Sequence, residues 1–166
     1  MDLGRSEQEG NHGGAVHSGN GFVTLLDGSR RWGLFGAAGV LVRNVDHLGV
    51  SWYLVALRSP RSHLGGTWAV PGGALDLGES PIDGALREFH EEIGFALAEY
   101  ELAGIYEDDH GGWSYWTALV DVAERFALPE NLPWETAEVK WVPANELAGL
   151  NLFDAFRQTL RRLNIC

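Results

Sequence analysis

The chain has 166 residues, of which 45% are hydrophobic and 21% charged, and its formal net charge at pH 7 is -11. This length and composition predict a single globular domain that buries a sizeable core. With 12 basic residues against 23 acidic ones, the surface repels a nucleic-acid backbone, which excludes long DNA or RNA as a partner. A small anion can still bind if a cation mediates the contact.

The first 20 residues are rich in Gly, His, Ser and Glu and contain few large apolar side chains. We expect a flexible tail over residues 1–20 and one domain over residues 21–166. No basic segment followed by an apolar run opens the chain, and the longest apolar run, residues 34–42, is too short to span a membrane. We therefore expect a cytoplasmic protein without a membrane partner.

The predicted strands are rich in β-branched or aromatic residues. They cover residues 38–44, 52–58, 102–107, 114–122 and 139–142. The turn sequences DHLG and DDHGG predict hairpins after the first and third of these strands. Helices are predicted at residues 81–93 and 151–163, with a short turn near 145–148. Mixed strands with two main helices indicate an α/β fold, a sandwich in which helices cover both faces of the sheet.

The helix at residues 81–93 has clear start and stop signals. Ser80 is a suitable cap, Pro81 suits the first turn, and Gly94 is suited to the C-terminal stop. Apolar residues recur at spacings of three and four, which predicts one buried face. This apolar face consists of Ile82, Ala85, Leu86, Phe89 and Ile93.

Three glutamates, Glu88, Glu91 and Glu92, lie together on another side of this helix, within an arc of about 100°. Like charges at these spacings destabilise a bare helix. One interpretation is a solvated acidic surface, which is the usual fate of a charge run. The other is that a divalent cation offsets the repulsion, since carboxylate oxygens suit Mg²⁺ or Mn²⁺.

The residues around the glutamates favour the cation. From Gly73 to Phe95 the sequence fits the pattern G-x5-E-x7-R-E-U-x-E-E-x-G-U, in which U is a bulky apolar residue. The probability of an accidental match is on the order of 10⁻⁹ per starting position. The chain therefore resembles the Nudix hydrolases, and a looser resemblance extends over about residues 33–163. Phe89 and Phe95 are aromatic where aliphatic residues are commoner in the family, a departure that should alter packing more than chemistry.

The resemblance implies an α/β/α sandwich with a mixed sheet, in which a loop, a helix and a turn hold cations against a diphosphate. Glu88, Glu91 and Glu92 are then the ligands for Mg²⁺ or Mn²⁺, and the carbonyl of Gly72 is a further ligand. Glu91 and Glu92 are also catalytic candidates, because one of the glutamates orients or deprotonates a water molecule. Glu88 and Glu92, one helical turn apart, are the central metal-binding pair.

The resemblance also implies roles for residues beside this metal set. Arg87 and Glu79 form a structural ion pair between loop and helix, with an ordinary surface pair as the alternative. Relatives supply a further carboxylate from a later loop, for which Glu135 is the candidate, six residues before Trp141. Glu138 is the alternative, and a solvated loop without any catalytic carboxylate stays open for both.

Substrate contacts are less well defined by the sequence. Arg58 and Arg61 are candidates for holding phosphates, because Arg is the abundant basic residue here. Trp68 is a candidate for stacking on a base, as are Trp113, Tyr115 and Trp116, although packing in the core is the commoner fate of such residues. Ordinary surface arginines remain the alternative for the first pair.

The function implied by the resemblance is that of a pyrophosphatase. It would be a metal-dependent hydrolase cleaving a phosphoanhydride bond in a small nucleoside diphosphate derivative, such as a nucleoside triphosphate or a nucleotide sugar. The alternative is a catalytically silent Nudix domain that binds a nucleotide as a sensor. A diphosphate isomerase would be expected to carry a core cysteine, whereas the only cysteine is the terminal Cys166. The oligomeric state stays open between a monomer and a homodimer.

Overall fold

The structure is a computed structural model and describes residues 17–166. Most of the predicted tail lies in residues 1–16, outside the described residues. Residues 17–20 lie along the domain: the carbonyl of His17 accepts a hydrogen bond from the Leu77 N–H (3.0 Å), and the Gly19 N–H donates to Asp76 (3.1 Å). Over residues 17–166, every helix is too short or too polar to cross a lipid bilayer.

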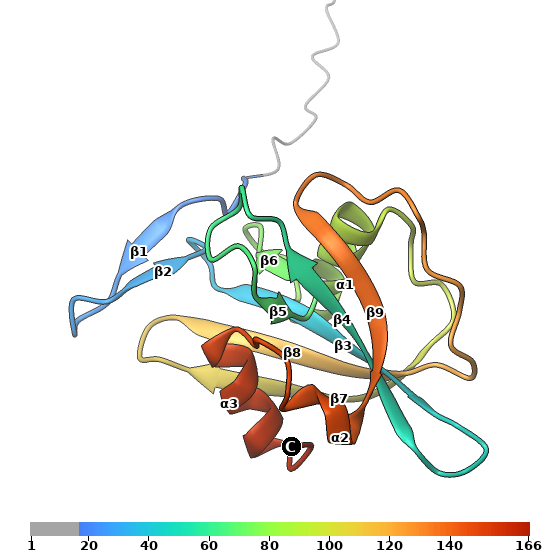
Figure 1. Cartoon of the computed structure of the whole chain (residues 1–166). Helices are drawn as coiled ribbons and strands as arrows, with labels where there is room; N and C mark the ends of the chain where they lie inside the picture. Colours follow the sequence, from blue (N-terminus) through green and yellow to red (C-terminus); the bar gives the residue numbers. More distant parts are fainter. Residues whose placement is uncertain (1–16) are drawn as a thin grey trace, which may run out of the picture.

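Strands dominate the described chain, and a few helices connect or cover them (Figure 1). In chain order the elements are β1 (Phe22–Thr24), β2 (Arg30–Trp32), β3 (Ala37–Val45), β4 (Ser51–Arg58), β5 (Trp68–Ala69), β6 (Gly72–Ala74), α1 (Pro81–Ile93), β7 (Glu101–Asp109), β8 (Ser114–Asp121), β9 (Thr136–Pro143), α2 (Ala144–Leu147) and α3 (Asp154–Arg162).

A seven-stranded mixed sheet forms the body of the domain. β3 pairs with β8 in parallel, while β8 with β7, and β4 with β9, pair antiparallel. β1 and β2 form a separate two-stranded hairpin. In Figure 1 this hairpin projects beside the sheet, at the same end as β6 and the turn between β7 and β8.

The two central strands β3 and β4 diverge. They pair only where Arg43–Val45 faces Ser51–Tyr53. Farther along, β6 pairs with β3 and β5 pairs with β4, so the segment WAVPGGA, residues 68–74, fills the gap between them. This arrangement brings the backbone of Gly72 and Gly73 into the middle of the sheet.

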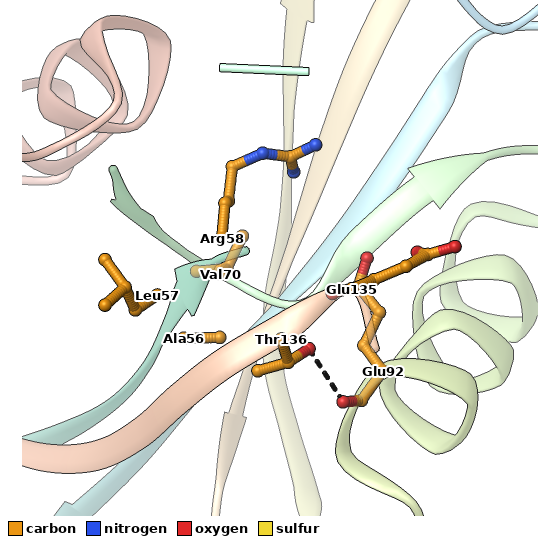
Figure 2. Close-up of a pocket in the computed structure, with 7 residues that line it drawn as sticks. All are labelled: Ala56, Leu57, Arg58, Val70, Glu92, Glu135 and Thr136. Carbon is orange, nitrogen blue, oxygen red and sulfur yellow. Dashed lines mark hydrogen bonds between the residues drawn. The ribbon is translucent and has the colours of Figure 1, made fainter. Parts of the chain in front are cut away.

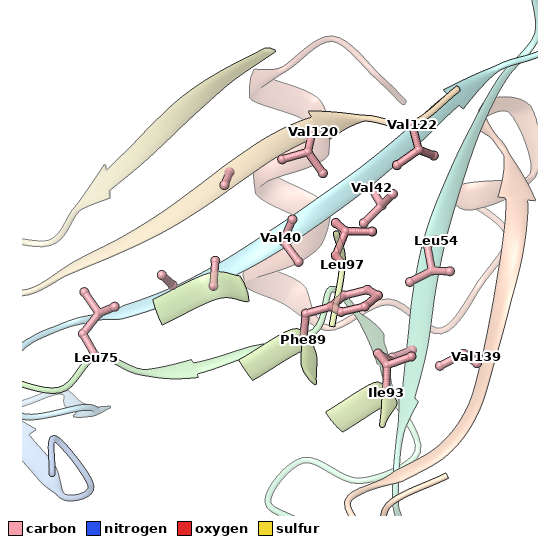
Figure 3. Packing of buried hydrophobic residues seen from close by; sticks show 14 residues of the cluster. Val40, Val42, Leu54, Leu75, Phe89, Ile93, Leu97, Val120, Val122 and Val139 are labelled. Atoms are coloured by element: carbon pink, nitrogen blue, oxygen red, sulfur yellow. The ribbon is translucent and has the colours of Figure 1, made fainter. Parts of the chain in front are cut away.

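Helices cover both faces of the sheet, and a core cluster lies on each face. On one face α1 directs Phe89 and Ile93 onto Val40, Val42, Leu54 and neighbouring side chains, as Figure 3 shows. On the other face α2 and α3 contribute Leu147, Phe156 and Leu160 to a second cluster. Burial of these apolar side chains supplies most of the driving force for folding. The predicted α/β sandwich with a mixed sheet is confirmed.

The long elements were predicted closely, and the short ones were missed. The helix at 81–93 has the predicted bounds, whereas the last helix begins three residues later, at Asp154, because Leu152 first forms a bridge with Trp68. β1, β2, β5 and β6 have two or three residues each, too few for a recognisable alternation.

Candidate active site

Helix α1 fixes the direction of the three glutamates. Ser80 Oγ accepts a hydrogen bond from the Asp83 N–H (3.3 Å), and Gly94 ends the helix in a left-handed conformation with φ of 97°. Ala85, Phe89 and Ile93 are fully buried against the sheet. Since these apolar residues hold one side of the helix on the core, the glutamates emerge at the side facing the Gly72–Gly73 strand.

The backbone of β6 lies directly against two of these carboxylates. A Cβ atom at Gly73 would come within 2.5 Å of the Glu88 carboxylate, so any larger residue there would displace this side chain. The Gly72 N–H donates a hydrogen bond to Oε2 of Glu92 (3.3 Å). The side chains of Glu88 and Glu92 therefore converge where β3 and β4 diverge.

Arg87 connects the loop before α1 with the acidic surface of the helix. Its guanidinium donates two hydrogen bonds to Glu79 (2.8 and 3.0 Å), and Nη2 also donates to the Ala74 carbonyl (2.8 Å). Nη1 lies 2.9 Å from Glu88 Oε1 and 3.3 Å from Glu91 Oε1. The side chain is more than two thirds buried. These contacts support the Arg87–Glu79 pair as a brace between loop and helix. The same guanidinium also contacts Glu88 and Glu91, two of the predicted metal ligands.

Glu135 and Arg58 face a small pocket together with Glu92 (Figure 2). The pocket has a volume of about 20 Å³, room for a water-sized group rather than a nucleotide. The Thr136 hydroxyl donates to the backbone carbonyl of Glu92 (2.8 Å), and the Ser59 N–H donates to the backbone carbonyl of Glu135 (2.9 Å). These two bonds tie β9 and the end of β4 to the C-terminal end of α1.

Burial makes the two inner carboxylates unusually hard to ionise. It raises the pKa of Glu92 to about 8, with the negative charge of Glu88 adding to the effect. Burial likewise raises the pKa of Glu88 to about 7, against the opposing influence of Arg87. A cation beside them would favour the charged forms, because opposite charge lowers a carboxyl pKa.

These donors suit a hard divalent cation but do not yet form a cage. Over residues 17–166, no three acidic, His or Cys side chains already stand at metal-binding spacing. Glu88 and Glu91 are held by Arg87, and Glu92 is turned toward the Gly72 N–H. The donor set nevertheless fits Mg²⁺ or Mn²⁺ in chemistry, since it consists of carboxylates placed beside a glycine backbone that an ion can approach closely.

The remaining predicted residues lie at different depths. Glu91 is 58% exposed, and Glu138 is exposed on β9 and does not line the pocket. The exposed Arg61 lies in the loop after β4, and Arg58 Nε donates to the His63 carbonyl (3.0 Å) of the same loop. Trp68 is 8% exposed and packs in the second core cluster with Lys140 over its ring, so in this conformation the ring is not free to stack on a base.

Tyr115 has a position that the sequence pattern did not indicate. Added Cβ atoms at Gly39 and Gly72 would lie 2.3 and 2.7 Å from its hydroxyl oxygen, so the phenol rests on the backbone of both strands. Burial raises the pKa of Tyr115, and the charge of Glu92 raises it further, so the hydroxyl remains a proton donor. From the sequence, Tyr115 was a candidate only for stacking on a base. Its contact with Gly39 and Gly72 depends on the pairing of β3 with β6, which the sequence did not indicate.

Comparisons with known proteins agree with this arrangement. The NUDIX domain family model matches residues 33–163. A candidate 8-oxo-dGTP diphosphatase 3 of Mycobacterium tuberculosis is 37% identical over 151 residues, covering 87% of this chain and 69% of that protein. A nucleoside triphosphate pyrophosphatase/Nudix hydrolase fusion protein of Bifidobacterium longum is 36% identical over 146 residues, or 86% of this chain, but the match spans only 30% of the fusion protein.

Among solved structures, the Nudix hydrolase RenU of M. smegmatis superposes with a TM-score of 0.78 at 37% sequence identity. The match covers 88% of this chain and 93% of RenU. The sequence relatives and this structure agree in family, and the matched region contains the whole Glu79–Arg87–Glu92 arrangement. The chain therefore belongs to the Nudix family of hydrolases.

Proposed function

We propose that this protein is a metal-dependent hydrolase that cleaves a phosphoanhydride bond in a nucleoside diphosphate linked to another group. Small nucleotides such as a nucleoside triphosphate or a nucleotide sugar are the expected substrates. One observation carries the proposal: Glu88 and Glu92 converge on the Gly72–Gly73 backbone, while Glu135 and Arg58 face Glu92 across the same pocket.

The cation expected in this family is Mg²⁺ or Mn²⁺. Glu88, Glu91 and Glu92 would hold it, with the carbonyl of Gly72 as a further ligand. A divalent cation supplies positive charge that neutralises the phosphate oxygens during cleavage. An acidic protein of net charge -11 needs such a charge to bind a polyanionic substrate.

Two arginine side chains would bind the phosphates of the substrate. Arg58 forms no ion pair with a neighbouring carboxylate in the described residues, so its two Nη groups are available to phosphate oxygens. Arg61, in the adjoining loop, is a second phosphate contact. The positive charges of both arginines would offset the repulsion between the acidic wall of the pocket and the negatively charged phosphates.

The reaction would consist of attack by water on one phosphorus. As the new P–O bond forms, the bond from that phosphorus to the bridging oxygen breaks, and the electron pair leaves with the departing phosphate. The proton of the water passes to a carboxylate oxygen of Glu92, Glu135 or Glu91, which acts as general base. Glu92 and Glu135 line the pocket and Glu91 does not, which favours the first two.

Product analysis tests this proposal. The protein would be incubated with Mg²⁺ in ¹⁸O-labelled water and a panel of nucleotide sugars, dinucleoside polyphosphates and nucleoside triphosphates, including 8-oxo-dGTP because of the M. tuberculosis relative. Phosphorus NMR should find the label in a nucleoside monophosphate or in pyrophosphate, and chelation should abolish turnover. Tight metal-dependent binding without turnover of any panel member would contradict hydrolysis and favour the sensor domain instead.

A further inference from the structure

Two aromatic rings, those of Tyr115 and Trp113, lead from the backbone of Gly72, which is hydrogen-bonded to Glu92, toward the β1–β2 hairpin. The Tyr115 hydroxyl lies against Gly72, and the Tyr115 ring centre is 6.5 Å from that of Trp113. Trp113 Nε1 donates a hydrogen bond to the Gly33 carbonyl (2.9 Å), directly after β2. The hairpin and the turn between β7 and β8 are therefore joined beside the site, at the end of the sheet seen at the left of Figure 1.

Arg31, on β2, places an unsatisfied donor at this junction. Its guanidinium carbon lies 5.9 Å from the centre of the Trp113 ring. Its Nε is buried and has no hydrogen-bond partner within residues 17–166. Buried donors are almost always paired, so an unpaired one needs an explanation, and an acceptor supplied by a ligand would provide it.

The neighbouring Arg30 is a natural contrast. It is exposed on the same strand, and its guanidinium lies over the Phe22 ring, with the guanidinium carbon 4.3 Å from the ring centre. Both arginines carry the same charge on the same hairpin. Only Arg31 combines a buried, unpaired nitrogen with a position beside the Trp113 ring.

We propose that the β1–β2 hairpin forms the nucleoside end of the substrate site, with Trp113 as a flat contact surface and Arg31 as the donor to a carbonyl oxygen of the base. This inference rests on the proposed function, because it assumes that the phosphates lie at the Glu92 end. β2 precedes the matched Nudix region, residues 33–163, so the specificity residue would come from outside that region.

The chemistry of the guanidinium selects the class of base. Arginine offers only donors, in a planar fork that suits adjacent acceptors such as O6 and N7 of guanine. Adenine carries an amino group in place of O6, and two sets of donors would then face each other. We therefore expect bases with a 6-carbonyl group to be preferred over adenine.

Inosine and adenosine nucleotides are a matched pair for the test, since inosine carries the 6-carbonyl group and adenosine the 6-amino group. kcat/KM for inosine triphosphate and ATP would be measured with Mg²⁺ for the wild type, Arg31→Met, Arg31→Lys and Arg30→Met. The wild type should prefer the inosine nucleotide, and Arg31→Met should reduce this preference roughly tenfold or more. Arg31→Lys keeps the charge but loses the fork, so it should also lose most of the preference. Arg30→Met should retain it.

Binding of the monophosphates separates this inference from the proposed function. Calorimetry with inosine monophosphate and AMP in Mg²⁺ needs no hydrolysis, and circular dichroism would verify the fold of each variant. Arg31-dependent selectivity without any turnover of triphosphates would overturn the hydrolase and support the nucleoside site. Turnover with equal base preference in the wild type and Arg31→Met, or an equal loss in Arg30→Met, would overturn the role of Arg31. Should Arg31→Met not fold, Arg31→Lys decides by the same criteria.

Discussion

Two arginine–carboxylate centres near opposite ends of β3 differ in how their charges are balanced. At the far end Arg43 and Asp121 form a closed pair, with Nε to Oδ1 at 2.6 Å and Nη2 to Oδ2 at 2.8 Å. At the catalytic end the single guanidinium of Arg87 contacts Glu79, Glu88 and Glu91.

The comparison separates a balanced structural ion pair from a cluster with excess negative charge. Arg43 and Asp121 satisfy each other, and nothing in their geometry requires a ligand. Around Arg87 the carboxylates outnumber the guanidinium, and within residues 17–166 the carboxylate of the nearby Glu92 accepts a hydrogen bond from the Gly72 N–H and has no basic partner. Like charges this close raise one another's pKa, and either protons or a bound cation can offset their repulsion. We therefore propose a functional role for the end of β3 beside Arg87.

Removing the charge of Glu92 should produce the largest effect. Glu92→Gln keeps the size of the side chain but removes a candidate metal ligand and base from the pocket. We expect kcat with Mg²⁺ to fall by on the order of 10²-fold or more. Asp121→Asn breaks the closed pair at the far end and should leave kcat nearly unchanged. Wild-type turnover in Glu92→Gln would remove Glu92 from the mechanism.

Glu135 and Glu138 provide a smaller, sharper contrast within one segment. Both residues are exposed, but Glu135 lines the pocket and Glu138 does not. Glu135→Gln should therefore reduce kcat by roughly tenfold or more, the lower range for a lost general base, while Glu138→Gln should stay near the wild type. The reverse order would transfer the role to Glu138, and unchanged rates in both variants would make both ordinary loop carboxylates.

The two arginines should differ in their contribution to stability. Arg87→Met removes hydrogen bonds to Glu79 and to the Ala74 carbonyl, which tie the loop to α1. We expect the free energy of unfolding to fall by roughly 2–3 kcal/mol in urea denaturation. Arg43 is as buried as Arg87 (28% and 29% exposed) but has one carboxylate partner, so Arg43→Met should cost less, about 1 kcal/mol. Equal losses would mean that the additional partners of Arg87 contribute no stability.

The free energy of unfolding should depend on pH, because Glu88 and Glu92 have raised pKa values in the folded state. In chelator, burial raises the pKa of Glu92 from its usual 4.5 to about 8, and that of Glu88 to about 7. Between the usual pKa of 4.5 and the raised values, the folded state therefore binds more protons than the unfolded state. The free energy of unfolding should decrease as the pH rises from about 5 to about 8. Glu92→Gln should flatten this decrease. The free energy of unfolding would be measured by urea denaturation at each pH. An increase in this free energy from about pH 5 to about pH 8 would contradict the raised pKa values of Glu88 and Glu92.

The sequence predicted those parts of the site that depend on local signals. The helix from Pro81 to Ile93 follows from its cap at Ser80, its glycine stop at Gly94 and its apolar spacing, all of which are readable within a few residues. The position of the three glutamates on that helix follows from its periodicity. Nudix membership and the α/β fold, both expected from the motif, were confirmed.

The parts that were missed depend on long-range pairing. The short strands β5 and β6 exist because β3 and β4 diverge and leave unpaired edges, which the sequence around Pro71 does not indicate. The Tyr115 hydroxyl reaches the site through contacts with Gly39 and Gly72, on two other strands. Arg31 and Trp113 meet although they lie far apart in the chain, so no local pattern connects them.

The central claim is that the catalytic end of β3 binds a divalent cation with its surplus carboxylates, whereas the far end does not. The most direct test is Mn²⁺ binding followed by electron paramagnetic resonance in the wild type, Glu88→Gln, Glu92→Gln and Asp121→Asn, each with its fold verified by circular dichroism. Bound Mn²⁺ broadens the signal of the free ion, so affinity is measured without any substrate. We predict that both glutamate variants lose roughly tenfold or more in affinity and that Asp121→Asn binds like the wild type. Equal Mn²⁺ affinity in all four proteins would contradict the account.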